Sequence, residues 1–392
     1  MWCGVASVIV LLAGLAGSGK VDGPTRMSPR LNVATPEAGD HVRLEARVFF
    51  SGHSLLNNPV PNFVAAIAEG GKTSMVWNQQ NLEGSSIEAR TRGSEGAERI
   101  EWSGYRRGRD REGNPVDVLA ELRGPHIGEQ RPYDVLIITE GHALLDNVIW
   151  SDTVRYLRHY HEQIIRADPN ATTYLFESWL SLNTKADPRA WIAYEKAASP
   201  AWSCVAERIN RSLEAEGRKD RIAPLPAGRA LAQLVELATT RGGVPGLTEP
   251  TVEQTLSRLF LDEVHLTPLG SYYVALVTYA VVFGQSPSGT WRPADIDPTL
   301  AATLQAIASQ FAADHIAESR NLPIDACRAY MRDFVGVYLA YQRNAGSLGK
   351  NRLWNQVQWL RFYLTWGALF SRTDSTNPFH YDPKTDVQYW FS

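Results

Sequence analysis

The chain has 392 residues but contains few cysteines: Cys3, Cys204 and Cys327. Their spacing fits neither a structural zinc site nor a CxxC redox motif, so both classes of site are excluded. Cys3 lies in an N-terminal stretch that we expect to be removed. At most one disulfide, between Cys204 and Cys327, can therefore form, and two free buried thiols are the alternative.

Several nucleotide and metal motifs are also missing. No GxGxxG follows the first predicted strand and no Walker-type sequence occurs, so neither a dinucleotide nor a nucleoside triphosphate site is supported. The nine histidines include no HxxxH or HExxH spacing. We therefore expect no cofactor and no metal. The net charge of −3 gives no electrostatic case for a nucleic acid or an anionic membrane as partner.

Long apolar runs are absent beyond the N-terminus, so we expect no membrane-spanning core. Residues 5–16 are apolar and end in small residues, although no positive charge precedes them. This pattern predicts a signal peptide over residues 1–20 and export to the periplasm or the exterior. An N-terminal membrane anchor and a buried helix are the alternatives. Residues 21–43, rich in Gly and Pro, are predicted to be a linker.

The remaining chain alternates short apolar strands with amphipathic helices. This alternation predicts an α/β domain over residues 44–285, with a doubly wound, parallel, five-stranded sheet in flavodoxin-like order. Residues 290–392 are predicted to be a helical C-terminal extension with helices at 297–318, 325–344 and 351–370. The predicted strands of the sheet are 47–51, 74–80, 133–139, 171–176 and 221–225.

Two motifs carry the chemistry. The first strand ends in Gly52-His53-Ser54-Leu55, and a helix starts at Val60. We therefore expect the Ser54 hydroxyl to lie at the carboxyl edge of the sheet, with helix N–H groups beneath it. Far downstream, Asp262 precedes His265 by three positions. That spacing allows the carboxylate to hold Nδ1 of the imidazole while Nε2 faces a serine. Alternatively, Asp262 caps a helix and His265 lies on the surface.

These two blocks resemble those of the SGNH (GDSL-like) hydrolases. Gly52-His53-Ser54-Leu55 is similar to their opening Gly-Asp-Ser-Leu block, and Asp262-x-x-His265 followed by a helix led by Gly270 is similar to their closing block. The resemblance covers residues 44–285. It implies the SGNH hydrolase fold and a catalytic triad of Ser54, His265 and Asp262.

The two middle blocks of that family match less closely. Gly84, in the turn after the second strand, corresponds to the glycine whose N–H faces the oxyanion; a simple turn glycine is the alternative. After the third strand, Glu140-Gly141-His142-Ala143 stands where the family has Gly-x-Asn-Asp. The asparagine donor is absent and Ala143 cannot replace it. We expect a ring N–H of His142, or a backbone amide of the Gly141 turn, to do so.

Other predictions concern the site's surroundings. Trp179 follows the fourth strand, where ligand contacts gather, and forms either a substrate wall or part of the core. Residues 88–131 carry mixed charge and are predicted to be a solvated loop or lid. A single helix is predicted over 148–167, on which His159 and His161 face apart and make a poor metal pair. Four aromatic residues share roughly one face of the last helix, which is predicted to be core rather than a ligand-binding face: Trp354, Trp359, Tyr363 and Trp366.

The predicted function is therefore a serine esterase that hydrolyses an acyl ester. The 12 Trp and 15 Tyr residues, with the expected export, favour O-acetyl groups on a carbohydrate as the substrate. An O-acyltransferase would use the same residues. The alternative from another class is a catalytically weak SGNH-like domain that binds a glycan. The partner is thus a small-molecule or glycan ester, and the oligomeric state is not indicated.

Overall fold

The computed structural model describes residues 43–93, 102–125, 127, 131–240, 242–318, 322–345 and 352–391. The predicted signal peptide and nearly all of the linker lie outside these residues. Residues His41–Ser392 form one compact unit. The C-terminal helices thus belong to the same unit as the sheet.

A five-stranded, all-parallel sheet with strand order β2-β1-β3-β4-β5 lies at the centre of this unit. This order confirms the predicted flavodoxin-like doubly wound fold. β3 is buried along its whole length and β1 is buried at every residue after Glu45, because helices cover both faces of the parallel sheet. The strands are β1 (Glu45–Gly52), β2 (Ser74–Asn81), β3 (Val135–Thr139), β4 (Thr172–Phe176) and β5 (Ile222–Leu225).

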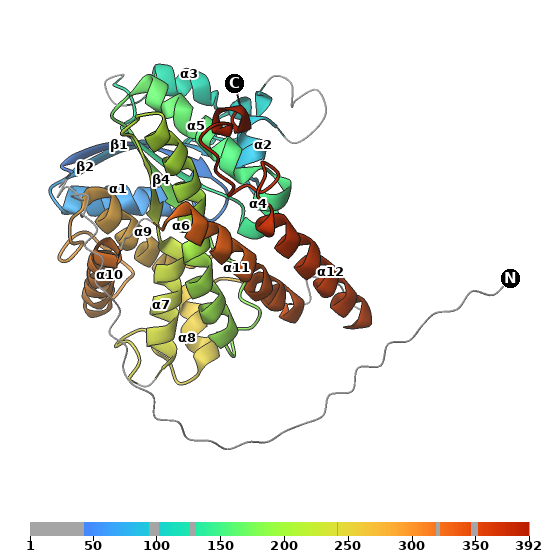
Figure 1. Cartoon of the computed structure of the whole chain (residues 1–392). Coiled ribbons are helices and arrows are strands. Elements are labelled where there is room, and N and C mark those ends of the chain that lie inside the picture. Colours follow the sequence, from blue (N-terminus) through green and yellow to red (C-terminus); the bar gives the residue numbers. More distant parts are fainter. Residues whose placement is uncertain are drawn as a thin grey trace, which may run out of the picture. The chain divides into compact units, whose positions relative to one another are not determined.

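Helices cover the two faces of the sheet. Figure 1 shows α1, α9 and α10 on one side and α2, α3 and α5 on the other. The helices of the α/β part are α1 (Val60–Gly70), α2 (Ile87–Thr91), α3 (Val118–Arg123), α4 (Leu144–Trp150), α5 (Thr153–Ala167), α6 (Arg189–Ala215), α7 (Ala227–Thr239), α8 (Val252–Leu259) and α9 (Pro268–Phe283).

Three details of the prediction for this part were wrong. The helix expected over 148–167 is broken into α4 and α5, because Asp152 adopts a left-handed conformation with φ 44°, and Trp150 at the break is 68% exposed. The region predicted as a solvated loop contains α2, α3 and a 3₁₀ turn, and it buries the charged Arg90 and Glu121. Helix α8 was not foreseen, although Thr251 and Gln254 form a capping box at its start.

The C-terminal extension consists of α10 (Pro298–Glu318), α11 (Ile324–Asn344) and α12 (Arg352–Ser371), close to the predicted bounds. A disulfide between Cys204 of α6 and Cys327 of α11 links the extension to the α/β part, which settles the choice left open between a disulfide and free thiols. The prediction of one aromatic core face on α12 was wrong: Trp366 is buried, but Trp354 and Tyr363 are 55% and 43% exposed.

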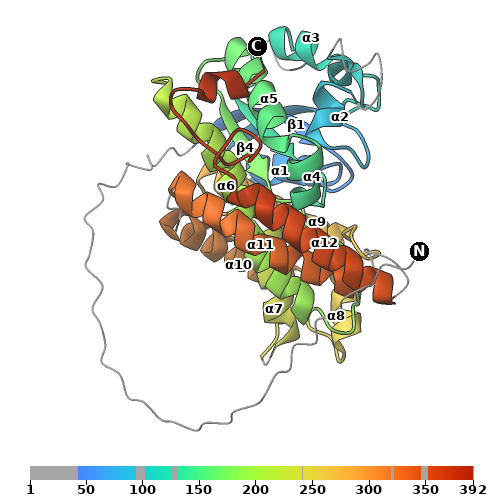
Figure 2. The same ribbon diagram turned by 45° about the vertical axis from the view of Figure 1, so that its right-hand side comes forward.

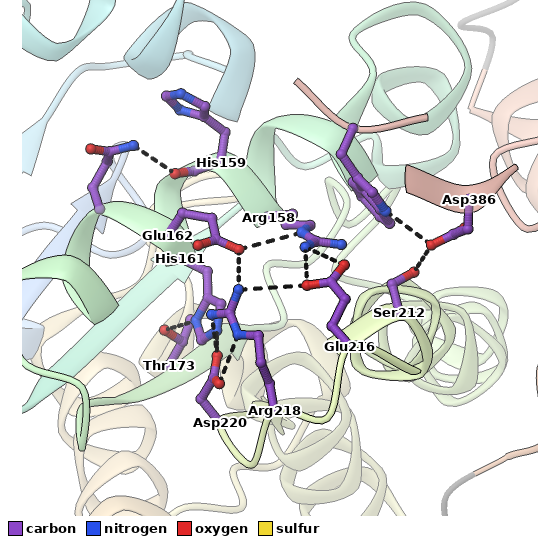
Figure 3. Close-up of polar contacts among 12 residues, drawn as sticks. Arg158, His159, His161, Glu162, Thr173, Ser212, Glu216, Arg218, Asp220 and Asp386 are labelled. Carbon is purple, nitrogen blue, oxygen red and sulfur yellow. Dashed lines mark hydrogen bonds and ion pairs between the residues drawn. The ribbon is translucent and has the colours of Figure 1, made fainter. Parts of the chain in front are cut away.

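The segment after α12 packs back onto α5 and α6. Arg208 of α6 forms a buried ion pair with Asp386 at 2.6 Å, and Asp386 also accepts hydrogen bonds from Ser212 Oγ and Trp390 Nε1. Figure 3 shows the contact between Ser212 and Asp386 beside a network of arginine and carboxylate side chains from α5 and the end of α6. Among the described residues, no helix is long and apolar enough to cross a membrane.

Candidate active site

Ser54, His265 and Asp262 form a continuous hydrogen-bonded chain. Ser54 Oγ lies 3.1 Å from His265 Nε2, and His265 Nδ1 lies 2.7 Å from Asp262 Oδ2. The structure thus brings together residues that are separated by 211 positions. These distances are those that proton transfer from a serine to an imidazole requires.

The loop between α8 and α9 holds the acid and the base as a unit. Asp262 Oδ1 accepts hydrogen bonds from the backbone amides of Val264 and His265, both at 2.7 Å. Partial burial favours a raised pKa, but these two amides and the His265 ring outweigh it and lower the pKa of Asp262 to about 2. Thr267, and not Asp262, caps the following helix α9. The alternative of Asp262 as a helix cap is therefore wrong.

Ser54 itself lies in a tight turn after β1. The amide of Leu56 donates to the carbonyl of His53 at 2.9 Å, which closes the turn, and α1 begins only at Val60. The expectation that the first helical N–H groups lie directly beneath the serine was therefore wrong. Gly52 is required at the strand end, because a Cβ there would lie 2.8 Å from that of Leu56 and 3.2 Å from Thr139 Cγ2.

His53, beside Ser54, is a structural residue. It is fully buried, its Nε2 lies 3.0 Å from the carbonyl of Glu140, and its Nδ1 accepts from the Leu55 amide at 3.4 Å. These contacts require the neutral ring with the proton on Nε2. Burial, with the nearby His142 and Arg90, lowers the pKa of His53 to about 3, so this form persists at physiological pH.

The turn after β2 contains Gly84, with φ +63°. Its backbone is tied to the nucleophile turn, because the Leu82 amide donates to the Gly52 carbonyl at 3.0 Å. A Cβ at Gly84 would meet nothing within 4 Å, so the glycine is required by its backbone conformation and not by close packing. The structure therefore supports the turn role of Gly84, which is an exposed residue.

Arg90, which the sequence did not single out, links three strand ends. Its guanidinium donates to Ser51 Oγ at 3.1 Å on β1, to Ser85 Oγ at 2.8 Å after β2, and to the carbonyl of Thr139 on β3. It is fully buried. Its surrounding sequence of mixed charge gave no signal that one of these arginines lies in the core.

Glu140, predicted as an oxyanion or substrate residue, is fully buried and does not line the site. Its carboxylate accepts from the amides of Ile87 at 2.9 Å and Gly141 at 2.7 Å and from Thr153 Oγ1 at 2.7 Å. Burial raises its pKa, which these hydrogen bonds and Arg90 partly offset. Glu140 therefore fixes the Gly141 turn and is a positioning residue.

His142 lies beside the triad, at the place of the missing asparagine. Its ring centroid is 4.7 Å from that of His53, and burial together with the neighbouring His265 lowers its pKa. Its Nδ1 is buried and has no hydrogen-bond partner in the described part of the chain. A hydrogen bond to the backbone of Trp179 partly offsets this lowering of the pKa, so His142 is a neutral imidazole packed against His53, the neighbour of Ser54.

Trp179 is 1% exposed, so the prediction of a substrate wall was wrong and the alternative of a core residue is correct. Its Nε1 donates to the carbonyl of Val264 at 2.8 Å, and Leu182 N donates to Glu263 O at 2.6 Å. The segment after β4 therefore supports the loop that carries Asp262 and His265.

Two shallow cavities lie near the site. One of about 560 Å³ borders Asp262 and is lined mostly by polar residues, among them Asn183, Thr184 and Lys185. The other, of about 360 Å³, contains Gly84 and Asn147. The side chains of His265 and Asp262 are 44% and 56% exposed, so water reaches the triad.

His159 and His161 of α5 make separate contacts. His161 is buried between Thr173 Oγ1 at 2.8 Å and Asp220 Oδ2 at 2.7 Å (Figure 3). His159 stacks on Trp102. No group of three or more potential metal ligands occurs in the parts of the chain that the structure describes.

Comparisons with known proteins give little further information. No family model matches the chain, and no curated protein does. A crystal structure of a DUF4886 family protein from Bacteroides uniformis is similar, with 15% identity and a TM-score of 0.46. The match covers 71% of this chain and 98% of that one.

Proposed function

We propose that the chain is a serine hydrolase of SGNH type that cleaves an acyl ester. The observation that carries this proposal is the hydrogen-bonded chain from Ser54 through His265 to Asp262. A helix cap and a surface histidine would not need Nε2 of the imidazole to lie 3.1 Å from a serine hydroxyl.

The proposed reaction has two stages. Ser54 Oγ attacks the ester carbonyl while His265 Nε2 takes its proton, and His265 then gives that proton to the leaving alcohol. Water attacks the acyl-serine in the second stage, with His265 again as base, and the carboxylic acid leaves. Asp262 holds the proton on Nδ1 throughout and stabilises the imidazolium form of His265.

The oxyanion of each tetrahedral intermediate requires preorganised donors. We assign the backbone N–H groups of Ser54 and Gly84 to this role, and the ring of His142 as the third donor. Its position just after β3, where the SGNH hydrolases carry their asparagine donor, supports the assignment. Glu140 and Arg90 hold the turns that present these groups.

Hydrolysis is favoured over acyl transfer because the triad is open to water. The exposed fractions of His265 and Asp262, 44% and 56%, leave no enclosed space in which an acceptor alcohol would outcompete water. The polar lining of the cavity beside Asp262 supports a polyhydroxylated alcohol, and we propose O-acetyl groups on a carbohydrate as the substrate class.

Labelling with a fluorophosphonate, followed by peptide mass spectrometry, tests the proposal. The wild type is expected to carry the label on Ser54, and Ser54→Ala is expected to lose both the label and p-nitrophenyl acetate hydrolysis, by about 10⁴-fold or more. Ser288→Ala, which alters an exposed serine far along the chain, serves as the matched control. Failure of the folded wild type to react with phosphonate or ester would refute the proposal.

His142→Ala tests the third donor separately. Loss of one oxyanion donor is expected to lower kcat by about 10²–10³ with little change in KM. His142→Gln, which restores an N–H donor, is expected to recover part of the loss. Unchanged kcat in His142→Ala would show that the ring has no part in the reaction.

A further inference from the structure

Helix α12 carries an unusual concentration of exposed apolar side chains. Six of the large apolar residues that are exposed in the described structure lie on this one helix. They are Leu353 (78% exposed), Trp354 (55%), Val357 (55%), Leu360 (50%), Tyr363 (43%) and Leu364 (60%), and we call them the α12 patch. Contiguous apolar surface of this kind marks an interaction site.

The patch lies on the half of α12 that is nearer to α11's C-terminal end. Arg343 near the end of α11 lies over the ring of Trp359 at 5.2 Å, and Tyr363 lies close to Gly336. α11 and α12 thus form an antiparallel hairpin, which Figures 1 and 2 show side by side in both views.

This end of the hairpin is fixed near the candidate active site. Tyr338 OH donates to Asp146 Oδ2 on α4, and Tyr341 OH donates to the carbonyl of Ser181, both at 2.6 Å. α4 follows the carboxyl end of β3 and Ser181 follows that of β4, so both anchors lie on the edge of the sheet that carries Ser54. Ser181 also lines the cavity beside Asp262.

The charge of α12 indicates what covers the patch. The helix contains no Asp or Glu, whereas it contains Arg352 and Arg361, and Arg372 follows it. Two copies of such a helix would bring like charges together, so a second copy is disfavoured. A surface of negative charge with an apolar layer beneath it is complementary to both features. The net charge of −3 for the whole chain conceals this local positive region.

We propose that the α12 patch binds the surface of a bilayer that contains anionic lipid. Leucine, valine and tryptophan side chains enter the boundary between headgroups and acyl chains, while Arg361 pairs with lipid phosphates. The helix lies on the membrane and does not cross it, because Asn355, Gln356 and Gln358 interrupt its apolar surface. An ester at the membrane surface would then lie on the same side of the molecule as Ser54, a consequence that rests on the proposed function.

Sedimentation with sucrose-loaded vesicles tests this proposal with the full chain. Binding is expected to vesicles of phosphatidylcholine with phosphatidylglycerol at 30 mol% as a rough working composition, and to be at least about tenfold weaker with phosphatidylcholine alone. The variant Val357→Gln/Leu360→Gln/Leu364→Gln is expected to lose at least about tenfold in binding. Leu237→Gln/Val387→Gln, which alters exposed apolar residues elsewhere, is the matched control.

Two further measurements distinguish the outcomes. Ser54→Ala is expected to bind vesicles as the wild type does, so failure of the esterase proposal leaves this result unaffected. Light scattering after gel filtration reports on self-association. No binding to the anionic vesicles, or equal binding by the triple variant, would overturn the proposal. So would a dimer that the triple variant dissociates, because a second copy would then cover the patch.

Discussion

Glu177 directly follows β4 and is predicted to make the stability of this fold depend on pH near neutrality. It is 1% exposed, and its carboxylate accepts from Ser199 Oγ at 2.7 Å and from the Arg229 amide at 3.4 Å. Burial raises the pKa of Glu177 from an ordinary value of 4.5 to about 7, because the hydrogen bonds from Ser199 and the Arg229 amide, with the charge of Arg229, offset only part of the loss of hydration.

The direction of the effect follows from proton binding. Between pH 4.5 and about 7 the folded chain keeps a proton on Glu177 that the unfolded chain has lost. The free energy of unfolding therefore falls as pH rises through this window. Each pKa unit of difference between the folded and unfolded chain corresponds to about 1.4 kcal/mol. A folded pKa near 7 therefore lowers the free energy of unfolding by about 3 kcal/mol once the pH exceeds 7.

Urea unfolding at pH 5, 6, 7 and 8, followed by tryptophan fluorescence, measures this cost. Glu177→Gln removes the titration, so the stability of the variant relative to the wild type is expected to rise by about 3 kcal/mol between the lowest and highest pH. The nearby Glu195 remains in both proteins, and much of its own contribution cancels in the difference. Glu112→Gln, at an exposed position, is the control. A difference between wild type and variant that stays constant with pH would refute the reasoning.

Further predictions address the triad loop and the disulfide. Asp262→Asn removes the carboxylate that fixes the His265 tautomer. It is expected to lower kcat for ester hydrolysis by about 10⁴-fold, while tryptophan fluorescence shows an intact fold. A loss below about tenfold would argue against the triad. Trp179→Phe removes the hydrogen bond to the Val264 carbonyl, which supports the loop that carries Asp262 and His265. It is expected to lower kcat by about tenfold, with KM and the midpoint of unfolding little changed. An unchanged kcat would contradict this role. Cys327→Ser opens the bridge to Cys204, which spans 123 positions, and is expected to cost about 2–5 kcal/mol in urea unfolding; equal stability under oxidising and reducing conditions in the wild type would contradict it.

Much of the fold was predictable because local patterns and tertiary structure agree. The helix Val60–Gly70 has its predicted bounds. The strand predicted over 133–139 ends at Thr139 as expected and begins two residues later, at Val135, and its apolar run reflects a parallel sheet that is covered on both faces. The break at Asp152 was not predictable, because the residues on either side continue a helical pattern and only tertiary packing imposes the positive φ.

The candidate site was predictable where the chemistry depends on spacing. Ser54, Asp262 and His265 could be named from their order and from the three positions between acid and base. Burial could not be predicted at single polar positions. Glu140 and Arg90 have the sequence features of surface residues, yet both lie in the core because backbone groups of neighbouring turns satisfy them. Trp179 was equally ambiguous, since tryptophan suits both a binding wall and a core.

The Asp262–His265 unit has a consequence of its own. Its three hydrogen bonds all lie within four consecutive residues of one loop and involve no atom of the Ser54 turn. A displacement of this loop would therefore leave the carboxylate and the imidazole paired and would change only the distance to the serine. Under the proposed function, catalytic competence then depends on the single distance between Ser54 Oγ and His265 Nε2, and not on the assembly of the base.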